Sequence, residues 1–320
     1  SVYLENSIQV INSTVVNAKQ YSSTNLTGLG QSVCVIDTGV NSSHPALKGR
    51  VIAEKCFCDV TDYGSGGCCS DNTNENNDAE DDYRHGTHVA GIIASNDTTY
   101  TGVAPEANIV AVKVTNSSGN ALYSDITQGV DWCKDNAATY NITAISISLG
   151  GGSYSAHCDA TFVAIGLTSA IDDAYNDNVS VVISTGNDYS SSNIGAPACI
   201  KNAIAVSSTT KLDAVSTFAN RNSITDMFAP GGTSTGSGAC PNANYICSTQ
   251  WTSGFIGYSG TSMSTPHVSG VIALMQQYEK EVEGKPLTGE EVNQTITTNG
   301  TLIDDSGGSG YSFYRLDALK

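Results

Sequence analysis

The stretch that decides the fold runs Tyr258-Ser259-Gly260-Thr261-Ser262-Met263-Ser264-Thr265-Pro266-His267-Val268. A Gly-Thr-Ser turn leads directly into an apolar run, residues 268–275, and this pattern predicts a buried helix. Ser262 would then stand at a helix start, where free backbone N–H groups and the helix dipole favour a developing negative charge. Pro266 fits there, because its missing N–H costs least near the first turn. Taken alone, a serine at a helix start is most often only an N-cap.

Two other stretches change that interpretation. Four apolar residues, Val33 to Ile36, end in Asp37 and a Gly turn. They predict a buried parallel strand with a carboxylate at its carboxyl end, the edge where open parallel sheets place their sites. His85 opens an apolar helix that we expect over residues 86–95. An Asp, a His and a Ser at the mouths of apolar elements are the parts of a nucleophilic triad.

Three motifs carry a resemblance to a known family: Asp37-Thr38-Gly39, His85-Gly86-Thr87-His88-Val89-Ala90-Gly91 and Gly260-Thr261-Ser262-Met263-Ser264-Thr265-Pro266-His267. They resemble the signatures of the subtilisin/proteinase K-like (subtilase) family of serine peptidases, and they follow the chain order Asp, His, Ser of subtilisin. The resemblance implies a serine endopeptidase that works through an acyl-enzyme. Ser262 would attack, His85 would transfer its proton, and Asp37 would orient and stabilise His85.

The resemblance also assigns the residues around the triad. Asn187, in a Gly-Asn turn, would hold the oxyanion through its amide, with the backbone N–H of Ser262 as the second donor. The remaining substrate-binding residues implied are Ser148, Leu149 and Gly150 as a strand that pairs with the substrate, Gly119, Asn120 and Ala121 as the opposite rail, and Ser184, Thr185 and Gly186 as the wall of the S1 pocket. Asp188 would lie near the rim of that pocket. We expect broad specificity with a preference for large apolar P1 side chains.

The rest of the sequence alternates apolar strands with helical stretches, which predicts an α/β fold: a doubly wound, mostly parallel sheet flanked by helices. Strands are expected over 109–114, 144–149 and 179–184, and helices over 124–138, 160–176 and, briefly, 15–21. No repeat or linker interrupts the pattern, so residues 1–320 are expected to form a single catalytic domain. A Cys-rich acidic loop insertion at about 54–84 is the main departure from the family.

Ten cysteines are unusual for a reduced compartment and favour disulfides in a secreted protein. Zinc is the alternative for Cys56, Cys58, Cys68 and Cys69, but their spacing does not match the usual zinc pairs. We expect these four to pair among themselves. Cys240 with Cys247, Cys34 with Cys133, and Cys158 with Cys199 then complete five disulfides.

Composition limits the partners. The net charge of −17 argues against nucleic acid, and no apolar run approaches 18 residues, so no membrane span is expected. Only 36 residues precede Asp37, too few for an inhibitory pro-segment. The chain is therefore expected to be a mature, monomeric, extracellular form that bound its own pro-segment earlier and now binds protein or peptide substrates.

Calcium is a possible structural cofactor, and no cofactor is expected for catalysis. One family calcium site uses an Asp after the His-Pro turn, and Ala46 occupies that position, so this site is expected to be missing. A second family site uses backbone carbonyls after a Pro-Ala turn and one Asp, which Ala198 and Asp226 match. The acidic run over 71–82 is either a solvated face or a calcium-binding loop.

Two alternatives to a broad endopeptidase remain. A processing protease specific for basic residues would need several acidic pocket residues, which cannot be placed in the sequence. A catalytically inactive structural or binding glycoprotein on the same fold is a different class of protein. The intact Asp37, His85, Ser262 and Asn187 argue against it.

Overall fold

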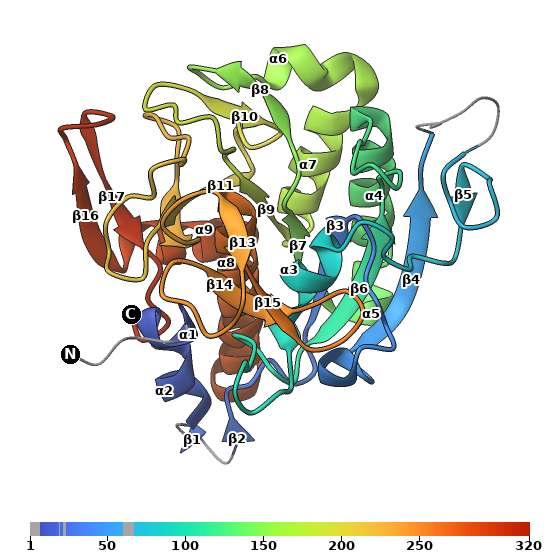
Figure 1. The fold of residues 1–320 in the computed structure, drawn as a ribbon, viewed down its shortest axis with the longest axis horizontal. Helices are drawn as coiled ribbons and strands as arrows, with labels where there is room; N and C mark the ends of the chain where they lie inside the picture. The colour runs from blue at the N-terminus through green and yellow to red at the C-terminus, as the bar shows by residue number, and fades with distance from the viewer. Residues whose placement is uncertain (1–6, 19, 22–23, 60–66) are drawn as a thin grey trace.

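The computed structural model describes residues 7–18, 20–21, 24–59 and 67–320. Its centre is a ten-stranded sheet in the order β16-β17-β12-β11-β9-β7-β3-β6-β4-β5 (Figure 1). All neighbours in this sheet are parallel except the two edge pairs, β16 with β17 and β4 with β5. The predicted mostly parallel sheet is therefore confirmed. The strands are β3 (Ser32–Asp37), β4 (Val51–Phe57), β5 (Glu75–Asn76), β6 (Asn108–Lys113), β7 (Ile142–Ile147), β9 (Ser180–Ser184), β11 (Ile204–Thr209), β12 (Met227–Pro230), β16 (Thr301–Asp305) and β17 (Tyr311–Arg315).

Helices cover both faces of this sheet. The α-helices are α1 (Ser7–Val10), α2 (Ser13–Ala18), α3 (His85–Ala94), α4 (Tyr123–Asp135), α5 (Ala137–Tyr140), α6 (Asp159–Phe162), α7 (Leu167–Asn176), α8 (Thr261–Tyr278) and α9 (Gly289–Thr298). Alternation along β3 explains the two layers, because successive side chains of a strand point to opposite faces. Val33 and Val35 join the core cluster of α3 and α8, whereas Cys34 and Ile36 join that of α4 and α7. The sheet is thus doubly wound, as predicted.

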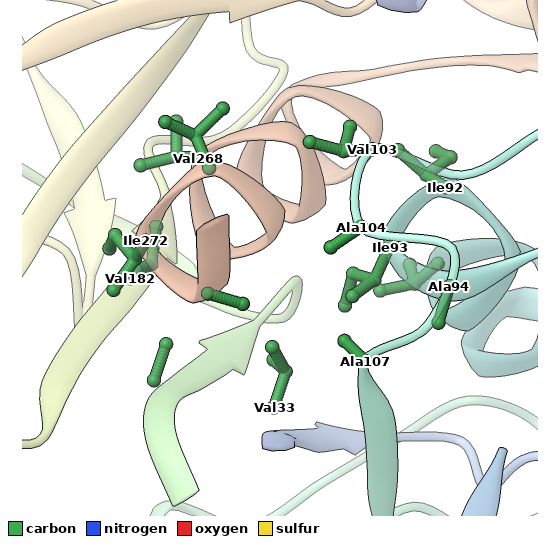
Figure 2. Close-up of a cluster of buried hydrophobic side chains, with 14 of the residues drawn as sticks. Val33, Ile92, Ile93, Ala94, Val103, Ala104, Ala107, Val182, Val268 and Ile272 are labelled. Atoms are coloured by element: carbon green, nitrogen blue, oxygen red, sulfur yellow. The ribbon is translucent and has the colours of Figure 1, made fainter. Parts of the chain in front are cut away.

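Helix α8 has more buried residues than any other described helix, 15 among its 18. Figure 2 shows Val268 and Ile272 on the side of α8 where Val182 of β9 lies, and Ile92 and Ile93 of α3 across the α8 ribbon from them; all five belong to one core cluster. Burying one Val or Ile side chain contributes about 1.5–3 kcal/mol, so this cluster fixes the position of α8 in the fold. The start of α8 is thereby held rigidly against the carboxyl edge of the sheet.

The carboxyl ends of neighbouring parallel strands meet at one edge. Asp37 ends β3, Ser148 follows β7, and Ser184 ends β9. Their register aligns Ile36 with Ile147, and Ile147 with Ile183. The described residues also form three small antiparallel sheets: β1 (Gln20–Tyr21) with β2 (Thr24–Asn25), β8 (Gly151–Tyr154) with β10 (Ile194–Ala196), and β13 (Gly236–Gly238) with β15 (Phe255–Ser259) and β14 (Ile246–Thr249).

All ten cysteines lie in the described residues and form disulfides. The pairs are Cys34–Cys133, Cys56–Cys69, Cys58–Cys68, Cys158–Cys199 and Cys240–Cys247. The predicted pairs are confirmed, and the four clustered cysteines do pair among themselves. Cys34–Cys133 ties the central strand β3 to α4 across a sequence separation of 99 residues.

Three predicted elements differ from the structure. The helix expected over 160–176 is broken into α6, a short 3-10 turn (Val163–Ile165) and α7, because Gly166 adopts a left-handed conformation with φ of 78°. The helix expected over 15–21 is α2, and Gln20–Tyr21 is a strand instead. The loop expected from about 54 begins later, since residues 54–57 still belong to β4. Part of it, residues 60–66, lies outside the described residues.

Candidate active site

Asp37 and His85 are joined directly by a side-chain hydrogen bond. His85, the first residue of α3, places Nδ1 2.7 Å from Asp37 Oδ1. The same Oδ1 accepts the backbone N–H of Thr38 at 2.7 Å, which fixes the carboxylate, and no described residue donates to the buried Oδ2. Burial by itself lowers the pKa of His85, but the charge of Asp37 and this hydrogen bond outweigh it and raise the pKa above its usual value. The pair is thus prepared to accept a proton on His85.

Ser262 is the second residue of α8, so its backbone N–H belongs to the first turn and has no partner within the helix. Its hydroxyl donates to the backbone carbonyl of Ser148 at 3.1 Å, and the Ser148 hydroxyl donates to the Ser262 carbonyl at 2.9 Å. Among the described residues, no hydrogen bond joins Ser262 to His85. The two residues do line one cavity, of about 580 Å³, together with Asn187 and Tyr258.

Asn187 is held by Thr261, the residue before Ser262. Asn187 Oδ1 accepts the backbone N–H of Thr261 at 2.8 Å and its hydroxyl at 3.0 Å. Because the oxygen is occupied, the Nδ2 group is the end of the amide left to donate elsewhere. A Cβ placed on Gly260 would lie 3.4 Å from that Nδ2, so the glycine keeps the space beside it open. Asn187 can therefore present an N–H donor next to Ser262.

A second cavity, of about 540 Å³, meets the first at Ser262 and Asn187. Ser148, Leu149 and Gly150 line it, as do Ser184, Gly186 and Asp188. Thr185 does not line it: its side chain is buried, and its hydroxyl donates to the Asn220 carbonyl at 2.7 Å. Gly186 has φ of +104°, which a residue with a side chain adopts only with strain, so this wall stays bare.

Gly119, Asn120 and Ala121, expected as the opposite rail, line neither cavity. They form a tight turn in which Asn116 N–H donates to the Asn120 carbonyl at 3.0 Å. A Cβ on Gly119 would lie 2.8 Å from the ring of Tyr83, which covers the turn. Ser117, earlier in the same turn, lines the first cavity instead.

Asp81 is a buried residue that sequence reasoning missed. Its Oδ1 accepts Thr38 Oγ1 at 2.9 Å and the N–H groups of Tyr83 and Arg84 at 3.0 and 2.8 Å. Its Oδ2 accepts the Thr87 N–H and hydroxyl at 3.0 and 2.6 Å. Thr38 in turn accepts the Gly86 N–H at 2.8 Å, so Asp81 fixes both sides of His85. Asp81 is therefore not part of a solvated face, whereas most of the acidic run over 71–82 is exposed. Apart from its place before the His motif, nothing in the sequence distinguishes Asp81 from its acidic neighbours.

His88 lies one turn beyond His85 and has the opposite environment. It is fully buried, and its Nε2 lies 3.0 Å from the Ile256 carbonyl. Burial lowers its pKa to about 3, so His88 stays neutral. The expectation that His88 is a packed structural histidine agrees with this environment.

Of the residues expected at the calcium site, Asp226 is half-buried and Ala198 is buried. Asp226 Oδ2 accepts the Ala205 N–H at 2.7 Å, and burial raises the pKa of Asp226 to about 7. Among the residues that the structure describes, no group of three or more His, Cys, Asp or Glu side chains could hold a metal. A calcium ion near Asp226 would therefore depend on one carboxylate and backbone carbonyls, which are hard oxygen ligands of the kind it prefers.

Comparison with known proteins gives one consistent result. The model of the subtilase family matches residues 28–312. The chain is 34% identical to thermitase from Thermoactinomyces vulgaris over 86% of this chain and 85% of that protein. It is 33% identical to alkaline serine exoprotease A from Vibrio alginolyticus over 92% of this chain, which spans only 47% of that protein.

A solved structure described as a cold adapted subtilisin-like serine proteinase has the same fold, with a TM-score of 0.73, 30% identity and 99% of each chain covered. The family match covers most of the chain, and these relatives exceed 30% identity over most of its length. The chain therefore belongs to the subtilase family of serine endopeptidases.

Proposed function

We propose that this chain is a secreted endopeptidase of broad specificity that hydrolyses proteins through an acyl-enzyme formed on Ser262. The observation that carries the proposal is the 2.7 Å contact between His85 Nδ1 and Asp37 Oδ1 in a cavity that Ser262 also lines. A histidine oriented in this way offers its Nε2 as a general base.

The catalytic steps follow from these contacts. The Ser262 hydroxyl turns from the Ser148 carbonyl towards His85, which removes its proton as the oxygen attacks the peptide carbonyl. The negative charge that develops on the carbonyl oxygen is stabilised by Asn187 Nδ2 and the Ser262 N–H. Protonated His85, stabilised by Asp37, then donates the proton to the leaving amine, and water hydrolyses the acyl-enzyme by the same sequence.

The cavity beside Ser148 supports a preference for large apolar P1 side chains. Bare glycine backbone at Gly150 and Gly186 leaves it wide, and among the described residues that line it Asp188 is the one with a charged side chain. Asp188 Oδ2 accepts Asn220 Nδ2 at 2.9 Å and stays exposed at the rim. A single exposed carboxylate contributes at most about 1 kcal/mol to binding a cation, less than burial of a large apolar side chain. This favours the broad enzyme over the processing protease specific for basic residues.

Two measurements on the same preparation test this function. A serine-reactive phosphonate should label Ser262 and no other serine, as peptide mapping would show. Cleavage of a peptide library should then give P1 preferences led by Leu, Phe, Tyr and Met. Labelling without cleavage would favour the inactive alternative, whereas cleavage confined to Lys and Arg would favour the processing protease.

Secretion is supported by the disulfides, which persist in oxidising compartments. No helix among the described residues could cross a membrane. We further propose that the chain acts as a monomer on protein substrates and bound its own pro-segment before maturation. Size-exclusion chromatography with light scattering should give a mass near 33.2 kDa, and a mass near twice that value would contradict the monomer.

Structural calcium at Asp226 and the Ala198 turn is part of this proposal. Raising the calcium concentration should raise the melting temperature of the wild type by linkage. Asp226→Ala should flatten that rise, whereas Asp304→Ala, a matched change at an exposed carboxylate, should keep it. An undiminished rise in Asp226→Ala would instead point to the acidic run over 71–82.

A further inference from the structure

One arginine stands at the catalytic cleft of a strongly acidic protein. Arg84 directly precedes His85 and lines the same cavity as His85, Tyr258 and Ser262. The chain has 14 Lys and Arg against 31 Asp and Glu, so a cation at this place is unexpected from composition. Its environment shows whether it serves the fold or faces the cleft.

The backbone of Arg84 is held in a conformation that a non-glycine residue seldom adopts. Its φ is +90°, in the left-handed region, and Arg84 caps α3 without a side-chain hydrogen bond. The Asp81 carboxylate compensates for this strain by accepting the Arg84 N–H at 2.8 Å. The backbone of this turn therefore sets the direction of the Arg84 side chain, whatever the guanidinium group binds.

The guanidinium packs over the ring of Trp251, with 5.7 Å from Cζ to the ring centroid. The Trp251 indole N–H donates to the Asp81 carbonyl, so the ring beneath the arginine is fixed as well. Cation–π contact restrains the side chain but leaves the N–H donors at the edge of the guanidinium available. Arg84 is thus pre-organised and exposed at the cleft.

The nearby carboxylates are already engaged. Asp82, in the same cavity, forms an ion pair with Lys113 Nζ at 2.6 Å, and Lys113 also donates to the Thr38 carbonyl at 3.0 Å. The buried Asp81 accepts five hydrogen bonds, and Asp37 is paired with His85. Among the described residues, none forms an ion pair with Arg84. Its donors are therefore free for a carboxylate of the substrate.

The side of the cleft follows from the two cavities that meet at Ser262. The proposed S1 cavity, with Ser148 and Gly186, receives the acyl part of the substrate, and Arg84 does not line it. Arg84 lines the other cavity beside His85, the group that protonates the leaving amine. We propose that Arg84 is a specificity-determining residue that binds an Asp or Glu side chain in the first two residues after the scissile bond, an inference that rests on the proposed function.

The test uses internally quenched peptides with one acyl-side sequence and Glu, Gln or Lys at the first or second position after the cleaved bond. The wild type should cleave the Glu peptide about fivefold faster than the Gln peptide at one of these positions, measured as kcat/KM, because an exposed charge-assisted pair is weak. The Glu/Gln ratio in Arg84→Gln should fall to about one. In Arg84→Lys it should fall between these values, because an ammonium lacks the bidentate geometry.

The ratio compares two substrates of one protein, so a partly unfolded variant does not distort it. Arg50→Gln removes the same charge outside both cavities and should keep the wild-type ratio and activity. A wild type that cleaves the Gln peptide with no preference for Glu, or prefers Glu only before the scissile bond, overturns this inference and leaves the proposed function standing. A wild type that cleaves none of the peptides overturns the proposed function itself.

Discussion

The catalytic cleft has two halves that are held in different ways. In the half formed by β3 and α3, Asp37 and His85 already form the hydrogen bond that the proposed chemistry needs. In the half formed by α8 and the turn after β9, Asn187 is locked by Thr261, but the Ser262 hydroxyl donates to Ser148 rather than to His85. The first half is assembled before substrate arrives, whereas the second needs one rotation of a hydroxyl. Small catalytic groups need only a cheap rotation, while a ring and a carboxylate must be positioned by the fold.

Removing the group that rotates should have the largest effect. Ser262→Ala leaves Asp37 and His85 paired but deletes the nucleophile, so kcat should fall on the order of 10⁶-fold, the loss found in subtilisin itself. Single-turnover assays with a sensitive peptide would measure it. Ser264→Ala, two residues on in the same helix, is the matched control because its buried hydroxyl donates to the Ala229 carbonyl instead. Equal activity of Ser262→Ala and Ser264→Ala would dismiss the proposed nucleophile.

Breaking the preassembled half should cost less. Asp37→Asn should lower kcat by about 10⁴-fold, as in other triads, because the amide favours the wrong His85 tautomer. The dependence of activity on pH should also change, and in a defined direction. Neutral His85 is the base, so activity falls as pH drops through its raised pKa.

In Asp37→Asn the negative charge beside His85 is lost, so the pKa of His85 falls. The acidic side, or limb, of the pH–activity profile should therefore move to lower pH. Asp304→Asn should leave both the rate and the limb unchanged. An unmoved limb in Asp37→Asn would show that another group sets it.

The oxyanion donor lies in the second half and should matter less than the triad. Asn187→Ala should lower kcat by about 10²–10³-fold with little change in KM, which is the loss found in subtilisin when one such donor is removed. Asn202→Ala is the control, since its amide donates to Asp172 at 2.8 Å and neither residue lines the two cavities of the cleft. A change confined to KM would mean that Asn187 binds the ground state and not the oxyanion.

The smallest effect should come from the residue that holds Asn187. Thr261→Val keeps the shape but removes the hydroxyl that donates to Asn187 Oδ1 at 3.0 Å and accepts the Gly186 N–H at 3.2 Å. Loss of the hydrogen bond to Asn187, of about 1 kcal/mol, should lower kcat about fivefold, whereas loss of the bond from Gly186, which lines the proposed S1 cavity, should act on KM. Thr265→Val is matched, because that hydroxyl donates to the Thr261 carbonyl and does not touch Asn187. If Thr265→Val slows the enzyme equally, the loss belongs to the helix and not to the amide.

Much of this arrangement could be predicted, because the local sequence determines it. Apolar strands that end in Asp37 or Ser184 indicate a parallel sheet, and a serine before an apolar run indicates a helix start. Three of the five cysteine pairs followed from spacing and number, whereas the partners within the cluster of Cys56, Cys58, Cys68 and Cys69 did not. These signals depend on neighbours in the sequence.

The rest depends on tertiary partners. Asp81 becomes a buried anchor only because Thr38, Thr87 and the turn around it converge on one carboxylate. Its neighbour Asp82 has the same side chain but forms an ion pair with Lys113 at the edge of the cleft. Likewise, the turn that contains Ser117 is covered by Tyr83, a residue far from it in the sequence. Local patterns in a single sequence do not indicate these contacts, because the partners lie far apart along the chain.

The link between Cys34 and Cys133 has a consequence for an enzyme surrounded by its own activity. It closes a covalent ring of chain that contains both Asp37 and His85. If another copy of the enzyme cuts this ring once, the two ends stay tethered to β3 and α4, and no fragment that carries half of the triad can diffuse away. A molecule that is cut once in this ring keeps Asp37 and His85 covalently connected, and the opened segment can fold back onto the intact sheet. The peptide bond stays cut, but the cross-link prevents loss of the segment that carries these two catalytic residues.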